Sequence, residues 1–211
     1  FLHSLVAQGY ETVLVGRMHF VGPDQRHGFT KRVGGDFCHT HWPDYAPDDA
    51  WMKAMGPYVH TTGAFGALRV AGGGGVSPGQ LYDRAVIEWA ERYLAEPHGR
   101  PQCIVVGTYG PHFPYAADAA LFGRHLESAT LPPTFSRERP SHANPFYRRM
   151  QQAPCERAAL AAQAAYRGMV EEQDRLFGRV MTAWEARPNA SKRPSVTVYT
   201  SDHGDTCGEH N

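Results

Sequence analysis

The sequence has no net charge, few cysteines and no long apolar run, and each absence excludes a class of protein. Lysine and arginine together number 21, as do aspartate and glutamate, and the pI is about 7.3. A balanced chain gives no reason to expect nucleic acid or a membrane as its main partner. No apolar stretch approaches the roughly 20 residues that a bilayer-spanning helix needs.

The four cysteines lie far apart in the sequence and form no Cys-x-x-Cys pair. This spacing argues against a structural zinc knuckle and does not support a disulfide framework. What the sequence does have is 42% hydrophobic residues over 211 positions, enough for one α/β domain or a large part of one.

The C-terminal stretch combines a predicted strand with a cluster of polar residues. Residues 195–200 read Ser-Val-Thr-Val-Tyr-Thr, a β-branched and aromatic composition that predicts a strand. Ser-Asp-His-Gly-Asp follows at 201–205, and adjacent Asp202 and His203 side chains can reach one divalent cation. The residues alone fit a metal or catalytic site, and equally a polar turn in which Asp202 caps a helix.

Two further strands are predicted at 12–15 and 102–107, each a short apolar run. Arg17 and His19 follow the first strand on alternate positions, which share a face on an extended backbone. His112 follows the second strand in a turn held by two prolines. By residue type alone, these positions also fit a surface cation, a partly buried histidine and an incidental turn histidine.

A helix is predicted after Ser77, because Ser77-Pro78-Gly79-Gln80 reads as a capping box. Its expected apolar stripe consists of Leu81, Ala85, Trp89 and Tyr93. A second helix is predicted over about 154–187. Residues 20–76 and 116–152 are expected to be loop-rich excursions. A helix between two buried strands predicts an α/β fold with a mostly parallel sheet.

Three motifs together resemble the sulfatase family of the alkaline phosphatase superfamily. They are Ser-Asp-His-Gly-Asp-x-x-Gly-Glu-His at 201–210, Pro-His-Phe-Pro-Tyr at 111–115, and Gly-Tyr-Glu-Thr…Gly-Arg-Met-His at 9–19. The continuation over 21–29 is most similar to choline-sulfatase-like members. The resemblance implies an alkaline-phosphatase-like fold, a mixed, mostly parallel sheet flanked by helices. Residues 1–211 are then expected to form part of a single catalytic domain, truncated at both ends.

The resemblance also implies roles for individual residues. Arg17, where the family usually has Lys, and His19 would contact the sulfate oxygens and the nucleophile. His112 would touch the bridging oxygen, where an imidazole can donate a proton to the leaving alcohol. Asp202 and His203 would be metal ligands. Catalytic residues are thus expected to be His19 and His112, and substrate-binding residues to be Arg17, His19 and His112.

The implied cofactors are a divalent metal and a formylglycine nucleophile. Calcium is the metal that the resemblance favours, whereas the nitrogen of His203 favours manganese or another transition metal. No Cys-x-Pro-Ser-Arg segment occurs in the sequence, so the formylglycine is expected outside this chain. The isolated chain is therefore expected to be inactive. Asp174 falls on the predicted apolar stripe of Val170, Phe177 and Met181, and it is expected to be a buried structural carboxylate, as on the family's comparable helix.

Three functions remain open from the sequence. The first is hydrolysis of a small sulfate ester. The second is a phosphodiesterase or phosphonate monoester hydrolase of the same superfamily, which an upstream Ser or Thr nucleophile would favour. The third is a non-catalytic metal-binding relative. A parent protein that lacks both the nucleophile and the family's early Asp-Asp metal pair, which are expected upstream of this chain, would favour it. A homo-oligomer is left open.

Overall fold

A computed structural model describes residues 1–20, 24–37, 72–74, 76–135, 155–188 and 194–209. The chain divides into two compact units. The first contains the described residues of Phe1–His60, Pro78–Tyr109 and Arg175–Val196. The second contains those of Thr61–Ser77, Gly110–Asp174 and Thr197–Asn211. Among the helices that the structure describes, none is both long and apolar enough to cross a bilayer.

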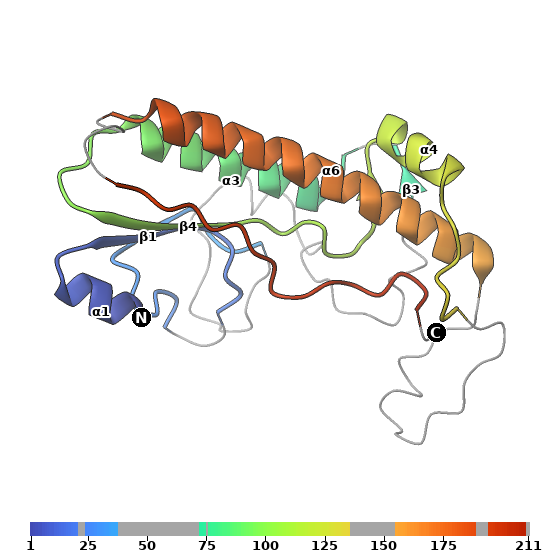
Figure 1. Cartoon of the computed structure of the whole chain (residues 1–211), viewed down its shortest axis with the longest axis horizontal. Helices are drawn as coiled ribbons and strands as arrows, with labels where there is room; N and C mark the ends of the chain where they lie inside the picture. The colour runs from blue at the N-terminus through green and yellow to red at the C-terminus, as the bar shows by residue number, and fades with distance from the viewer. Residues whose placement is uncertain (21–23, 38–71, 75, 136–154, 189–193, 210–211) are drawn as a thin grey trace, which may run out of the picture. The chain divides into compact units, whose positions relative to one another are not determined.

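The first unit is built on a parallel sheet of three strands, β1 (Glu11–Gly16), β2 (Lys31–Val33) and β4 (Gln102–Gly107) (Figure 1). Their order is β2-β1-β4, so β1 is the central strand. β1 pairs with β4 over its whole length, and Gly16 lies opposite Gly107. The two strands predicted from apolar runs are therefore confirmed, and they end side by side.

Helices cover both faces of this sheet (Figure 1). Val13 and Val15 are fully buried in a cluster that contains residues of α3 (Pro78–Ala95). Leu14, which points to the opposite face, is buried in a cluster that contains α1 (Leu2–Ala7). Burial on both faces explains why β1 is an apolar run and not an alternating pattern. The α/β prediction is confirmed.

The predicted helix of the first unit is confirmed, but its buried face differs from the predicted stripe. Leu81 is 47% exposed. Of the predicted stripe, Tyr93 is buried. The helix buries an overlapping apolar set, comprising Tyr82, Val86, Ile87, Ala90, Tyr93 and Leu94. A spacing of four selects a face only approximately, because the helical repeat is 3.6 residues.

The second unit contains a parallel pair of very short strands, β3 (Gly72–Gly73) and β5 (Ala116–Ala117). α4 (Ala119–Glu127) follows, and the Asp118 carboxylate caps it by accepting from the Ala120 N–H at 2.9 Å. This helix lies within 116–152, where a loop-rich excursion is predicted. α6 (Glu156–Ala186) contributes its residues up to 174 to this unit.

Two expectations from the sequence are wrong. Residues 195–200 form no strand, and Val196 and Val198 are 86% and 77% exposed. A β-branched segment becomes a strand only by pairing its backbone with a neighbour, and no described strand pairs with this one. Asp174 is exposed and not buried, because α6 turns its Ala165, Met169 and Leu176 face inward instead.

Candidate functional site

The first part of the candidate site lies where β1 and β4 end. The chain leaves β1 through Gly16, whose φ is +84°, and the Arg17 N–H donates to the Gly107 carbonyl at 2.9 Å. A Cβ on Gly107 would stand 1.8 Å from the Arg17 carbonyl oxygen, which is closer than any real contact. The two glycines therefore allow the Arg17 backbone to lie directly against the end of β4.

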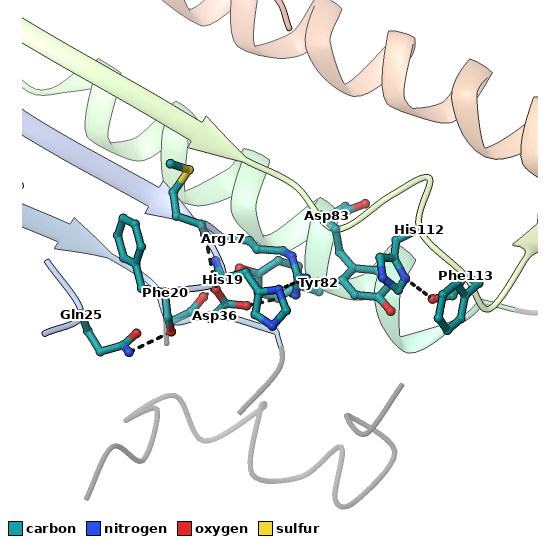
Figure 2. Close-up of polar contacts among 12 residues, drawn as sticks. Arg17, His19, Phe20, Gln25, Asp36, Tyr82, Asp83, His112 and Phe113 are labelled. Atoms are coloured by element: carbon teal, nitrogen blue, oxygen red, sulfur yellow. Dashed lines mark hydrogen bonds and ion pairs between the residues drawn. The ribbon is translucent and has the colours of Figure 1, made fainter. Parts of the chain in front are cut away.

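The Arg17 guanidinium is held by Asp36 and His19, which Figure 2 shows beside it, and by the Tyr109 ring. Its Nη1 donates to Asp36 Oδ1 at 3.2 Å, and its Nη2 lies 3.1 Å from His19 Nδ1. The ring of Tyr109 lies beneath it, 5.0 Å from the guanidinium carbon. With its side chain only 12% exposed, Arg17 is a fixed cation and not a mobile surface arginine.

His19 is exposed and adopts a left-handed backbone conformation with φ +50°. Such a conformation is uncommon for a residue with a side chain. It is stabilised by Asp36 Oδ2, which accepts from the backbone N–H of His19 at 2.7 Å and of Met18 at 3.3 Å. Because a guanidinium only donates, His19 Nδ1 must accept from Arg17, and the proton of the neutral ring lies on Nε2.

The start of α3 fixes the two loops that surround Arg17. The Tyr82 hydroxyl donates to the Gly35 carbonyl at 2.8 Å, next to Asp36. The Asp83 carboxylate accepts from the Tyr109 N–H at 2.6 Å. Burial, followed by the charges of nearby Asp36 and Asp83, raises the pKa of Tyr82 well above its ordinary value. Tyr82 therefore stays a neutral donor.

Sequence reasoning did not identify Asp36 or Asp83. Asp36 is 3% exposed and Asp83 is 1% exposed, so both are deeply buried carboxylates. The signal available for Asp36 was its position in Gly-Gly-Asp, just after a short β-prone stretch. Asp83 gave no signal, because one acidic residue in the first turns of a helix is common.

His112 lies in the second unit, after the turn that leads from β4. Its Nδ1 lies 2.6 Å from the Phe113 carbonyl, and its ring packs against the Phe113 ring with centroids 4.3 Å apart (Figure 2). The peptide bonds before Pro111 and Pro114 are both cis. A carbonyl only accepts, so Nδ1 carries a proton. His112 can then donate a proton through Nε2 only in its doubly protonated form.

Asp202 and His203 also belong to the second unit, and both are exposed. Asp202 Oδ1 accepts from the His203 backbone N–H at 2.9 Å, and Asp202 Oδ2 lies 3.4 Å from His203 Nε2. His203 Nδ1 donates to the Gly204 carbonyl at 2.7 Å. This hydrogen bond and the Asp202 charge raise the pKa of His203 above its ordinary value.

The donor atoms of this pair fit a metal ion as two of its ligands. Asp202 Oδ2 and His203 Nε2 lie 3.4 Å apart, close enough to bind one ion together. A ligating histidine usually donates its second ring N–H to a carbonyl, as His203 does to Gly204. Within the described residues, no group of three or more potential ligands gathers, so the pair does not complete a site by itself.

The loop after this pair is anchored, in contrast to the pair itself. Cys207 is 4% exposed and packs in the core with Tyr115 and Ala162. A Cβ on Gly208, whose φ is +108°, would lie 2.8 Å from the Ala159 Cβ. Burial raises the pKa of Cys207 to about 12. Cys207 is therefore a packed thiol, as expected for a bystander and not for a nucleophile.

The structure thus brings Arg17 and His19 together in the first unit, and Asp202 and His203 together in the second. His112 belongs to the second unit, where its Nδ1 and its ring contact Phe113.

Comparison with known proteins supplies the context for these residues. The sulfatase family model matches residues 1–211. A choline-sulfatase from Rhizobium meliloti (strain 1021) is 26% identical over 230 aligned residues, which cover 99% of this chain and 43% of the relative. The chain thus spans less than half the length of this relative.

Proposed function

The chain belongs to the sulfatase family, and from this premise we propose that the protein hydrolyses a sulfate monoester. The reaction would release inorganic sulfate and an alcohol. The observation that carries the proposal is the Arg17–His19 pair, a fixed guanidinium beside an exposed imidazole at the carboxyl ends of two parallel strands. α/β proteins place their ligands at this edge of the sheet.

Arg17 and His19 supply what a sulfate group requires of its binding site. A guanidinium offers charge and directed N–H donors to the tetrahedral oxyanion. His19 adds a neutral N–H donor at Nε2, with its orientation set by Arg17. Donors that are already in place stabilise the charge that develops on the sulfate oxygens without reorganisation in the transition state.

His112 is proposed to assist departure of the alcohol. With Nδ1–H committed to the Phe113 carbonyl, the proton for the alkoxide oxygen would come from Nε2. His112 must therefore be an imidazolium when the bond to sulfur breaks. General acid catalysis of this kind typically contributes about 10²- to 10⁴-fold to the rate.

Asp202 and His203 are proposed to ligate the divalent metal of the family. A bound divalent ion would polarise the sulfate group and lower the pKa of the nucleophile. Calcium is the ion implied by the family resemblance, whereas the nitrogen donor of His203 favours manganese. The metal content of the purified protein, measured by mass spectrometry, distinguishes the two.

The nucleophile is proposed to be a formylglycine that lies outside residues 1–211. The substrate is proposed to be a small alkyl sulfate, because one relative is named a choline-sulfatase. Choline sulfate is one member of this class to be tested.

The proposal is tested by incubating the full-length protein with choline sulfate, an aryl sulfate, an aryl phosphodiester and an aryl phosphonate monoester. Sulfate release is measured for the two sulfate esters, and phenol release is measured for the three aryl esters. The proposal expects the highest kcat/KM for a sulfate ester. A clear preference for the phosphorus esters would instead indicate a phosphodiesterase or phosphonate monoester hydrolase. No turnover of any ester by metal-loaded protein would favour a non-catalytic relative.

A further inference from the structure

We infer that Asp36 is a positioning residue for the sulfate site: it acts through Arg17 to fix the tautomer and direction of His19. This inference rests on the proposed function and deepens it, because it concerns the same site. Asp36 belongs to the loop after β2, and it stands 19 residues from Arg17 in the sequence.

The first argument is the burial of the Asp36 carboxylate. It is 3% exposed, and an ionised carboxylate is costly to bury unless it is paired and hydrogen-bonded. Asp36 meets this requirement by accepting from Arg17 and from two backbone N–H groups. Arg32 Nη2 adds a second cation at 3.9 Å. These partners hold the carboxylate in one orientation.

The second argument is what the two carboxylate oxygens do. Oδ1 binds the Arg17 side chain, whereas Oδ2 binds the His19 backbone at 2.7 Å. The same carboxylate therefore sets the guanidinium and the left-handed backbone that carries the imidazole. Without it, His19 would lose a hydrogen bond that stabilises an uncommon conformation with φ +50°.

The third argument is the chain of donors that leads from Asp36 to His19. Asp36 accepts from Nη1 of Arg17, which leaves Nη2 directed at His19 Nδ1 at 3.1 Å. That contact keeps Nδ1 unprotonated and places the ring proton on Nε2. The geometry thus makes His19 Nε2 a hydrogen-bond donor toward an oxyanion. Asp36 determines this tautomer indirectly, through Arg17.

The residues on both sides of Asp36 are anchored by buried contacts, as a positioning role requires. Gly35 accepts from the Tyr82 hydroxyl at 2.8 Å, and the Phe37 ring packs against those of Tyr82 and Tyr109 at 5.3 and 4.3 Å. Phe37 is 2% exposed. The core therefore fixes the backbone on both sides of Asp36.

Asp24 provides a matched control in the same unit. Its carboxylate also accepts from two backbone N–H groups, those of Arg26 and His27, at 2.9 and 3.0 Å. Asp24 has a 64% exposed side chain, and it contacts Arg26 and His27 rather than Arg17 or His19. Asp24→Asn removes the charge of a carboxylate with similar backbone hydrogen bonds, and it leaves Asp36, Arg17 and His19 unchanged.

The test compares Asp36→Asn, Asp36→Glu and Asp24→Asn in the full-length protein. kcat and KM are measured on the best sulfate ester, and thermal unfolding and binding of inorganic sulfate by calorimetry are measured alongside. Asp36→Asn is expected to lower kcat/KM by about 100-fold, mainly in kcat, because a displacement of about 1 Å at a reacting centre has an effect of this size. Asp36→Glu, which keeps the charge but moves it, is expected not to restore the activity. Asp24→Asn is expected to leave both constants unchanged.

A double-mutant cycle with His19→Ala separates positioning from general stability. If Asp36 acts through Arg17 and His19, Asp36→Asn costs far less activity once His19 is absent. An equal loss in both backgrounds would overturn the inference. Failure of both Asp36 variants to fold would also overturn it, since Asp36 would then be a stability residue.

The binding measurement keeps the inference separate from the proposed function. If the protein hydrolyses no sulfate ester but binds inorganic sulfate in a manner weakened by Asp36→Asn, the proposed function fails and the inference stands. If the protein is active and Asp36→Asn changes neither sulfate affinity nor kcat, the inference fails alone. If the folded protein neither turns over sulfate esters nor binds sulfate, both fail.

Discussion

The two ends of the three-stranded sheet in the first unit both carry a cluster of polar side chains around one carboxylate. At the amino end the carboxylate is Glu11, which accepts from the Tyr93 hydroxyl at 3.1 Å and from Gln102 Nε2 at 3.0 Å. At the carboxyl end it is Asp36, which accepts from Arg17 and from two backbone N–H groups.

The histidine at each end shows the difference between the clusters. His98, at the amino end, stacks on the Tyr93 ring with centroids 4.3 Å apart, and its Nε2 lies 2.9 Å from the Tyr93 carbonyl. Its side chain is 16% exposed and its backbone φ is not positive. His19, at the carboxyl end, is exposed and held in a left-handed conformation.

The amino-end cluster therefore resembles a structural network, whereas the carboxyl-end cluster directs an imidazole toward the surface. Strained backbone that the surroundings impose, beside a fixed cation, is typical of functional sites. The contrast indicates that polar clustering alone does not identify a site. The two ends differ in two ways. At the carboxyl end the histidine is exposed, and its backbone is held in a strained, left-handed conformation.

The largest effect is expected from Arg17→Ala at the carboxyl end. Removing a preorganised oxyanion donor typically lowers kcat by about 10²- to 10³-fold. The control is Arg92→Ala on α3, where an exposed arginine donates to the carbonyl of Glu88 in its own helix. Sulfate release measures both. A loss below tenfold for Arg17→Ala would contradict its role in binding the oxyanion.

Gly107→Ala tests whether the strand ends must meet closely to form the site. The added Cβ would stand 1.8 Å from the Arg17 carbonyl oxygen, so the backbone must move. We expect a destabilisation of about 1–3 kcal/mol in urea unfolding, as for other overpacked sites, together with reduced activity. Gly99→Ala, where a Cβ would meet nothing within 4 Å, is the control. Equal stability of the two variants would show that the fold does not require the close contact between Gly107 and the Arg17 backbone.

Glu11→Gln is expected to affect stability at the amino end and to leave the activity intact. Burial acts to raise the pKa of Glu11, but the hydrogen bonds from Gln102 and Tyr93 outweigh it and hold the pKa below its ordinary value. A depressed carboxyl pKa contributes stability above the unfolded-state pKa, and this contribution is lost as pH falls through the folded-state pKa.

The variant should therefore be less stable by about 1 kcal/mol at pH 7. The difference should shrink as the pH falls below about 4, where the unfolded glutamate is protonated. Urea unfolding at several pH values measures this. A destabilisation that does not change with pH would mean that the charge of Glu11 has no part in the network.

The smallest effect concerns the anchored loop of the second unit. Burial raises the pKa of Cys207 to about 12, so at pH 8 only about 1 in 10⁴ molecules carries the thiolate. Iodoacetamide should label exposed Cys155 in the native protein and Cys207 only after unfolding. Peptide mass spectrometry measures both. Equal labelling rates would contradict the burial of this loop beside Asp202 and His203.

Local sequence was sufficient to predict β1, which precedes Arg17, and α3, which packs beside that strand. An apolar run predicted β1, a capping box predicted α3, and a strand end predicted where Arg17 and His19 leave the sheet. The same reasoning failed for residues 195–200. β-propensity describes what a segment can do when paired, and the pairing depends on distant residues.

The residues that hold the site were also beyond local reasoning. Asp36 and Asp83 accept hydrogen bonds from residues 17 to 26 positions away, and no spacing rule connects them. Asp174 failed for the opposite reason, because a helical stripe drawn with the wrong phase placed an exposed carboxylate in the core. The chemistry of a site can be predicted from its motif, whereas its supporting contacts require the fold.

The comparison between the two ends is tested most directly by sulfate release from the full-length protein carrying His19→Ala or His98→Ala. Both variants remove an imidazole from the same sheet, one from each end. The account predicts a loss of about 100-fold or more for His19→Ala and near wild-type turnover for His98→Ala at a temperature where both are folded. Similar losses for the two variants, or a larger loss for His98→Ala, would contradict the placement of the sulfate site at the carboxyl end.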